Sequence, residues 1–144
     1  MALSEVEFHT GVADSVAFAC RLLRKAYRQG VRVTVTAPAA VLATLDRELW
    51  TFEERDFVPH VRLGPGTPAA LAARTPIWLL EGGVPAGAPQ VLVNLGAEMP
   101  AADAPFERVI EIVSSDGEDA ERGRSRWREY KARGLAVKHH AAAG

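Results

Sequence analysis

The chain has 144 residues, 48% of them hydrophobic and 24% charged, which is typical of one globular domain with a buried core. Its formal net charge of -1 supplies no general basic field, so direct nucleic-acid binding would need a local patch. No stretch approaches the roughly 20 apolar residues of a membrane span, and the amino end is neither basic nor followed by a long apolar run. We therefore expect a single domain over residues 1–144, in the cytoplasm, that binds neither a membrane nor nucleic acid directly.

The first third of the chain predicts alternating strands and helices. Residues 6–9 alternate apolar and polar side chains as a strand does, and the segment that follows, to Gln29, has apolar residues at helical spacing. Residues 31–36 form a clear second strand, and residues 39–50 carry the apolar stripe of a second helix. The single cysteine, Cys20, lies among apolar residues of the first helix, and we expect its side chain to be buried.

The rest of the chain continues the pattern with shorter segments. Residues 56–60 and 64–66 predict a structured loop, and residues 68–74 predict a short helix. Apolar or alternating runs predict strands at residues 77–80, 91–93 and 106–113. Ser115-Asp-Gly-Glu118 has the spacing of a capping box, which would open a helix that ends near Arg133. This order favours an α/β fold, a three-layer α/β/α domain with a largely parallel central sheet, Rossmann-like but without a nucleotide site.

The sequence lacks the motifs that bind cofactors or metals and those that perform nucleophilic catalysis. The first strand-to-helix turn, residues 8–11, has no glycine triplet for a pyrophosphate, and residues 64–66 and 82–83 lack the lysine and hydroxyl of a phosphate loop. No cysteine or acidic residue stands at zinc-ligand spacing from the histidines at positions 9, 60, 139 and 140. There is also no Gly-x-Ser-x-Gly turn. We expect no cofactor, no metal site and no catalytic residue.

A basic segment near the carboxyl end is the first candidate binding site. Residues 122–133 hold six cations and one carboxylate, a net charge of +5. At about 100° per residue, four side chains of this helix project from one side: Arg124, Trp127, Arg128 and Lys131. Guanidinium groups suit carboxylates, including a free chain terminus, and an aromatic floor accepts an apolar last residue. The alternative is that Trp127 and Tyr130 pack on the sheet and the cations form an ordinary solvated face, which is the more common case for a helix.

A cluster of aromatic residues is the second candidate. Trp50 closes the second helix, and Phe57 and Pro59 follow in the loop beyond it. Such clusters occur in cores and as anchors of protein interfaces. Periodicity does not choose between these two interpretations, and most apolar clusters belong to a core.

Three motifs together resemble a known family. Leu45-Asp-x-x-Leu-Trp50, then Phe57-Val-Pro-His60, then Arg126-x-x-x-Tyr130 with Gly134 after the last helix, are similar to the chi subunit of the bacterial DNA polymerase III holoenzyme, a clamp-loader accessory subunit. The resemblance implies a non-catalytic subunit of a DNA-directed DNA polymerase holoenzyme that takes part in DNA replication. It also implies two partners, the psi subunit and the acidic C-terminal tail of single-stranded DNA-binding protein.

The resemblance assigns residues to both partner surfaces. For the tail it implies Val113, Arg124, Trp127 and Arg128, and helix geometry adds Lys131 one turn further along. Trp127 stands where the family can carry tyrosine and Arg128 where it can carry lysine, so the aromatic and cationic types are kept. For psi the resemblance implies Trp50 and Phe57, with Val58 and Pro59 as neighbours, and a helicase is a second candidate partner there. His60 completes the motif without an assigned role.

Two other functions remain open at the level of the sequence. The fold class alone would also suit a small nucleotide- or substrate-binding α/β enzyme. Residues 122–133 could bind single-stranded DNA directly, but only Trp127 shares a face with the cations, whereas stacking platforms present several rings.

Overall fold

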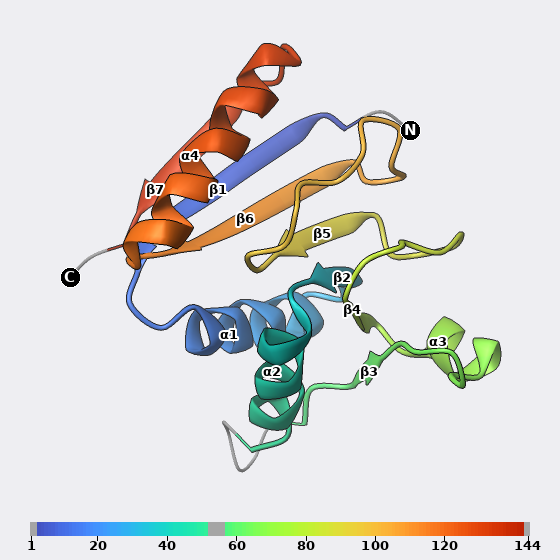
Figure 1. Ribbon diagram of the computed structural model, residues 1–144. Helices are drawn as coiled ribbons and strands as arrows, with labels where there is room; N and C mark the ends of the chain where they lie inside the picture. The colour runs from blue at the N-terminus through green and yellow to red at the C-terminus, as the bar shows by residue number, and fades with distance from the viewer. Residues whose placement is uncertain (1–2, 52–56, 143–144) are drawn as a thin grey trace.

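The computed structural model describes residues 3–51 and 57–142 of the chain. In this part of the chain, one sheet has the strand order β3-β4-β2-β5-β6-β1-β7, and all neighbouring strands run parallel (Figure 1). The strands are β1 (Glu5–Val12), β2 (Val33–Thr36), β3 (His60–Arg62), β4 (Ile77–Leu80), β5 (Val91–Asn94), β6 (Arg108–Ser114) and β7 (Val137–Ala141). The helices are α1 (Ser15–Arg28), α2 (Ala39–Thr51), α3 (Ala69–Arg74) and α4 (Gly117–Ala132).

Helices cover both faces of this sheet. Helices α1 and α2 lie on one face and α4 lies on the other (Figure 1). Successive residues of a strand point to opposite faces, so Ile112 packs in the core under α1 and α2, whereas its neighbour Val113 packs with Tyr130 of α4. Cys20 is buried in the core under α1 and α2, as predicted. The predicted three-layer α/β/α architecture is confirmed.

Two strands were not predicted, and both lie at the edges of the sheet. Strand β3 has three residues and begins at His60, which the prediction placed in a loop; residue 56 of that loop lies outside the described residues. Strand β7 pairs with β1 from Val137 to Ala141, but its side chains after Val137 are exposed. Burial therefore imposes no hydrophobic pattern on β7, and its long-range pairing with β1 leaves no local sequence signal.

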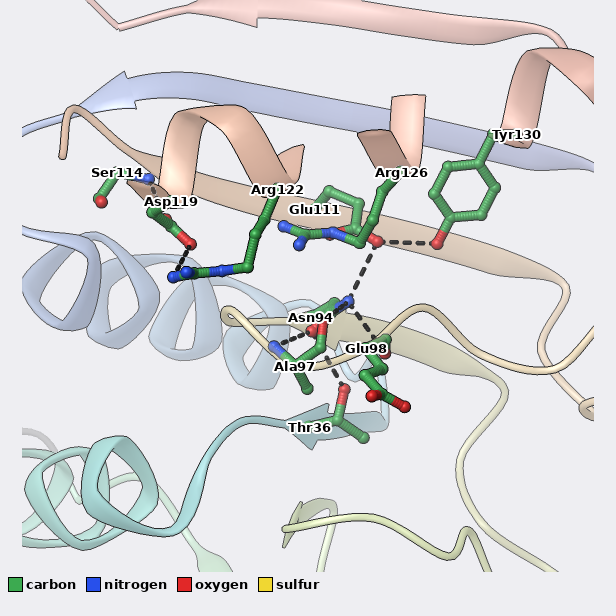
Figure 2. Close-up of polar contacts among 10 residues, drawn as sticks. All are labelled: Thr36, Asn94, Ala97, Glu98, Glu111, Ser114, Asp119, Arg122, Arg126 and Tyr130. Atoms are coloured by element: carbon green, nitrogen blue, oxygen red, sulfur yellow. Dashed lines mark hydrogen bonds and ion pairs between the residues drawn. The ribbon is translucent and has the colours of Figure 1, made fainter. Parts of the chain in front are cut away.

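The start of α4 differs from the predicted capping box. Asp116, not Ser115, is the N-cap: its carboxylate accepts a hydrogen bond from the Asp119 backbone N–H at 3.2 Å. Asp119 in turn accepts from the Ser114 backbone N–H at 2.7 Å, which ties the first turn of the helix to the end of β6 (Figure 2). The helix ends at Ala132, and Gly134, two residues later, has a φ of +82°, the left-handed conformation that stops a helix.

The chain leaves the neighbouring strands β1 and β6 toward opposite faces. Strand β1 leads into α1 on one face, and β6 leads into α4 on the other (Figure 1). In open parallel sheets, binding sites form beyond the carboxyl ends of two neighbouring strands whose connections go to opposite faces of the sheet. The topology therefore directs attention to the ends of β1 and β6 beneath α4. In the described part of the chain, no helix is long and apolar enough to cross a membrane.

Candidate functional site

A cavity of about 620 Å³ lies between α4 and the carboxyl ends of β1, β6 and β7. We call it the α4 cavity. Residues from all four elements line it, among them Phe8, Val113, Arg124, Trp127, Arg128 and His139. The cavity lies where the connections that follow the neighbouring strands β1 and β6 go to opposite faces of the sheet. Arg124, Trp127 and Arg128, which were predicted to share one side of the helix, therefore line a cavity and not a flat surface.

Trp127 forms one wall of the α4 cavity and is held by other rings. Its ring centroid lies 5.2 Å from that of Phe8 and 5.6 Å from that of His139, both in edge-to-face geometry. The ammonium nitrogen of Lys131 lies 5.6 Å from the Trp127 ring centroid, within the range of a cation–π interaction. Trp127 is half-buried, so it presents a fixed apolar surface to the cavity.

The cations around the α4 cavity are accessible to a negatively charged partner. Arg124 donates a hydrogen bond to Glu121 at 2.6 Å, and both side chains are exposed. The hydrogen bond and charge of Arg124, with the nearby charge of Arg128, lower the pKa of Glu121. Exposed ion pairs are weak because water competes for both groups. A carboxylate from another protein can therefore replace Glu121 at little cost.

The structure brings the predicted tail-binding residues together. Val113, Arg124, Trp127 and Arg128 line the same cavity, and Lys131 lies over the ring of Trp127. Sequence reasoning missed the contribution of the opposite wall, where the Thr10 hydroxyl and His139 Nε2 are hydrogen-bonded at 2.6 Å. Because β7 was not predicted, nothing in the sequence placed His139 beside α4.

Beneath the α4 cavity, a buried polar network fixes α4 to the sheet. Glu111 of β6 is fully buried and accepts hydrogen bonds from Arg126 Nε (3.0 Å), the Tyr130 hydroxyl (2.7 Å) and Asn94 Nδ2 (3.1 Å) (Figure 2). Burial raises the pKa of Glu111, although the charge of Arg126 and the three hydrogen bonds oppose the shift. Burial likewise raises the pKa of Tyr130, with the Glu111 charge adding to the shift. The Arg126-x-x-x-Tyr130 motif thus acts inside the protein.

Trp50 and Phe57 form an exposed aromatic pair near the opposite edge of the sheet. The residues are 55% and 59% exposed, and their ring centroids lie 5.2 Å apart. The interpretation of this cluster as core is therefore wrong for these two residues. The placement of Val58 on the partner surface also needs correction, because Val58 is fully buried and packs in the core beneath α2. Pro59 is partly exposed beside them.

A larger cavity, about 740 Å³, lies at the carboxyl ends of β2, β4 and β5, where a nucleotide would bind in related folds. Its ionisable lining residues are Glu81, Glu98 and Asp103, which would repel a phosphate group. Within residues 3–51 and 57–142, no group of three or more His, Cys, Asp or Glu side chains could hold a metal ion. The geometry gives no support to the nucleotide-binding alternative.

These features define a three-layer α/β domain with two candidate partner surfaces, one at each edge of the sheet. The model of the family described as DNA polymerase III chi subunit, HolC, matches residues 3–138. The chain is 33% identical over 123 residues to the DNA polymerase III subunit chi of Pseudomonas aeruginosa, covering 85% of this chain and 82% of that protein. It is 28% identical over 120 residues to the Haemophilus influenzae subunit chi, covering 81% and 79% of the two chains. The chain belongs to the family of DNA polymerase III chi subunits.

Proposed function

We propose that this chi subunit bridges the psi subunit of the clamp-loader assembly and the acidic C-terminal tail of single-stranded DNA-binding protein during DNA replication. The observation that carries the proposal is the separation of the two candidate surfaces. The α4 cavity adjoins β7 and the aromatic pair adjoins β3, and these strands are the two edges of the sheet. Both surfaces can therefore be occupied at the same time. As a replication protein it would act in the cytoplasm, without catalysing a reaction itself.

The chemistry of the α4 cavity supports the assignment of the tail. Arg124 and Arg128 can each donate two parallel hydrogen bonds to a carboxylate, whether it belongs to an acidic side chain or to the chain terminus. Trp127 and Val113 provide apolar surface for the last side chain of the peptide. A short acidic peptide with an apolar end matches both requirements.

The aromatic pair supports the assignment of a second protein partner. Exposed tryptophan and phenylalanine residues that touch each other are uncommon on a protein surface and are enriched at the centres of interfaces. Trp50 and Phe57 would bind psi, and Pro59 would lie at the margin of the contact. A helicase is a further candidate for the same surface.

The tail site is tested with a synthetic peptide that has several acidic residues and a terminal phenylalanine. We expect micromolar binding by calorimetry, about -8 kcal/mol, that weakens as added salt screens the charges. Arg128→Ala should lower the affinity by about tenfold or more, because a hydrogen bond to a charged group contributes roughly 1.5–3 kcal/mol.

Arg122→Ala is the matched control for this experiment. It removes the same charge from α4, but Arg122 pairs with Asp119 and does not line the α4 cavity. Equal affinity of Arg128→Ala and the wild type would exclude the site. Tight binding of a labelled oligonucleotide, with no partner protein present, would instead favour direct recognition of single-stranded DNA.

The second surface is tested by capturing psi with immobilised wild type, Phe57→Ala and Leu71→Ala. Leu71 is the control, because it is a large hydrophobic residue, 45% exposed, on α3. We expect Phe57→Ala alone to lose psi. A complex that contains psi, this chain and the peptide together, observed by size-exclusion chromatography, would establish the bridge. Mutually exclusive binding of psi and peptide would contradict it.

A further inference from the structure

The side chain of His60 is buried next to Trp50, within the same aromatic cluster. Its ring nitrogen Nδ1 lies 2.7 Å from the Val58 carbonyl oxygen, and Nε2 lies 2.9 Å from Oδ1 of Asp46 on α2. The His60 side chain is 0% exposed, whereas that of Asp46 is 35% exposed. The histidine therefore joins the start of β3 to the last turns of α2.

Both partners of the His60 ring are hydrogen-bond acceptors. A carbonyl oxygen and a carboxylate can only accept, and a neutral imidazole has one N–H to donate. Only the doubly protonated ring satisfies both contacts. Asp46 is the one charged group that contacts His60 among the described residues, and strand β4 places the apolar Ile77 beside it in register. The arrangement thus suits an imidazolium paired with a carboxylate.

The buried His60 ring also contacts the exposed aromatic pair, through Trp50. Its centroid lies 4.8 Å from that of Trp50, and Trp50 in turn lies 5.2 Å from Phe57. Tryptophan attracts a cation near its ring more strongly than the other aromatic residues do. A charged His60 would therefore hold the Trp50 ring in place, and Trp50 would hold Phe57.

We propose that protonated His60 is a positioning residue that fixes Trp50 and Phe57 in their binding arrangement, which makes this partner surface dependent on pH. Loss of the proton leaves one ring nitrogen facing an acceptor, so the ring loses a hydrogen bond and its attraction to Trp50. The consequence for psi rests on the proposed role of the aromatic pair. The coupling between His60 and Trp50 does not rest on it and can be measured in the isolated chain.

The first experiment follows the isolated protein by nitrogen-15 NMR between pH 5 and pH 8.5. The His60 ring nitrogens report whether the ring is doubly protonated, and the indole N–H of Trp50 reports its surroundings. Trp78 is the internal reference, because its indole N–H donates to the Ala72 carbonyl at 2.7 Å and its side chain lies on the opposite face of β4 from Ile77, the residue paired with His60. We expect the Trp50 signal to move together with the His60 titration while that of Trp78 stays fixed. A neutral His60 throughout, or an unmoved Trp50, would overturn the proposal.

The second experiment compares psi affinity for wild type, Asp46→Asn and Glu48→Gln across the same pH range. Asparagine still accepts a hydrogen bond from His60 but carries no charge, so we expect affinity at pH 7 to fall about five- to tenfold and to recover in part at lower pH. Glu48→Gln makes the same charge change on the same helix, facing the groove against α1, and should match the wild type. If the wild type does not bind psi, the proposed function fails, while the NMR titration still decides the role of His60. If Asp46→Asn binds psi as the wild type does, His60 does not position the surface.

Discussion

Gly123 of α4 packs directly against Val113 of β6. A Cβ atom added at Gly123 would lie 2.8 Å from Cγ1 and 2.9 Å from Cγ2 of Val113, closer than such atoms approach in proteins. The helix can therefore lie this near the sheet only because position 123 has no side chain. Both residues line the α4 cavity, so the depth of the cavity depends on this contact.

Gly123→Ala should therefore destabilise the protein and weaken peptide binding. The added methyl group must push α4 away from β6 or displace Val113, which costs about 1–3 kcal/mol in a packed interior. Urea denaturation would measure the loss of stability, and calorimetry with the acidic peptide would measure the loss of affinity. Adding Val113→Ala removes both obstructing methyl groups, so the double variant should recover part of the stability lost in Gly123→Ala.

Gly117→Ala is the matched control for this substitution. Gly117 begins the same helix, but a Cβ atom there would meet no atom within 4 Å. Alanine is the better helix former, so Gly117→Ala should be neutral or slightly stabilising. A Gly123→Ala variant as stable as Gly117→Ala would show that α4 does not need the close approach.

Helix α4 shows how far the sequence could predict the site. Helical spacing alone placed Arg124, Trp127 and Arg128 on one side, and the structure confirms that they face one cavity. The opposite wall could not be predicted, because His139 lies on an exposed edge strand whose position depends on pairing with β1. The hydrophobic pattern of a sequence reveals a strand only where its side chains are buried, and most side chains of β7 are exposed.

Exposure was the other property that the sequence did not determine. Trp50 and Val58 have similar hydrophobic character, yet Trp50 is 55% exposed and Val58 is fully buried. Val58 packs in the core with Leu45 and Leu49 of α2, whereas Trp50 of the same helix lies outside that core. Hydrophobic residues between two elements therefore require the tertiary structure before they can be assigned to a core or to an interface.

Glu111→Gln should reduce stability by about 3–5 kcal/mol, because it leaves the buried charge of Arg126 without its partner. The substitution keeps the size of the side chain, so the loss reports on charge and hydrogen bonding rather than on packing. Urea denaturation at pH 7 would measure it.

The double variant Glu111→Gln with Arg126→Met tests the cause of that loss. Removing both charges should be less damaging than removing one, since an apolar replacement of a buried pair is often nearly neutral. If the double variant were as unstable as the sum of the two single variants, the Glu111–Arg126 pair would not be the source of the effect.

His139→Ala should weaken peptide binding by about two- to fivefold, less than Arg128→Ala, since it removes one aromatic contact of Trp127 worth roughly 0.5–1 kcal/mol. His140→Ala is the matched control: it is the next residue of β7, but its ring stacks on His9 on the other face of the sheet, with centroids 4.9 Å apart. Calorimetry with the same peptide compares the two. Equal losses would mean that general charge, and not the cavity wall, accounts for the effect.

Cys20 gives the protein a specific loss of stability at alkaline pH. Burial raises the pKa of its thiol from 9.0 to about 11, with the charges of Glu48 and Asp14 adding to the shift. The folded protein therefore holds this proton more tightly than the unfolded chain does. The resulting stabilisation is fully present below pH 9 and is lost as the pH rises toward 11.

Urea denaturation of wild type and Cys20→Ala between pH 8 and pH 11 isolates this contribution. The other groups that titrate in this range are common to both proteins, so they cancel in the difference between the two free energies of unfolding. Alanine lowers stability by a constant amount that does not depend on pH. We expect the wild type to lose about 1–3 kcal/mol more than Cys20→Ala over this range, since each pKa unit corresponds to about 1.4 kcal/mol. Parallel pH profiles would mean that water reaches the thiol in the folded protein and that the core beneath α1 is less tightly closed than its packing indicates.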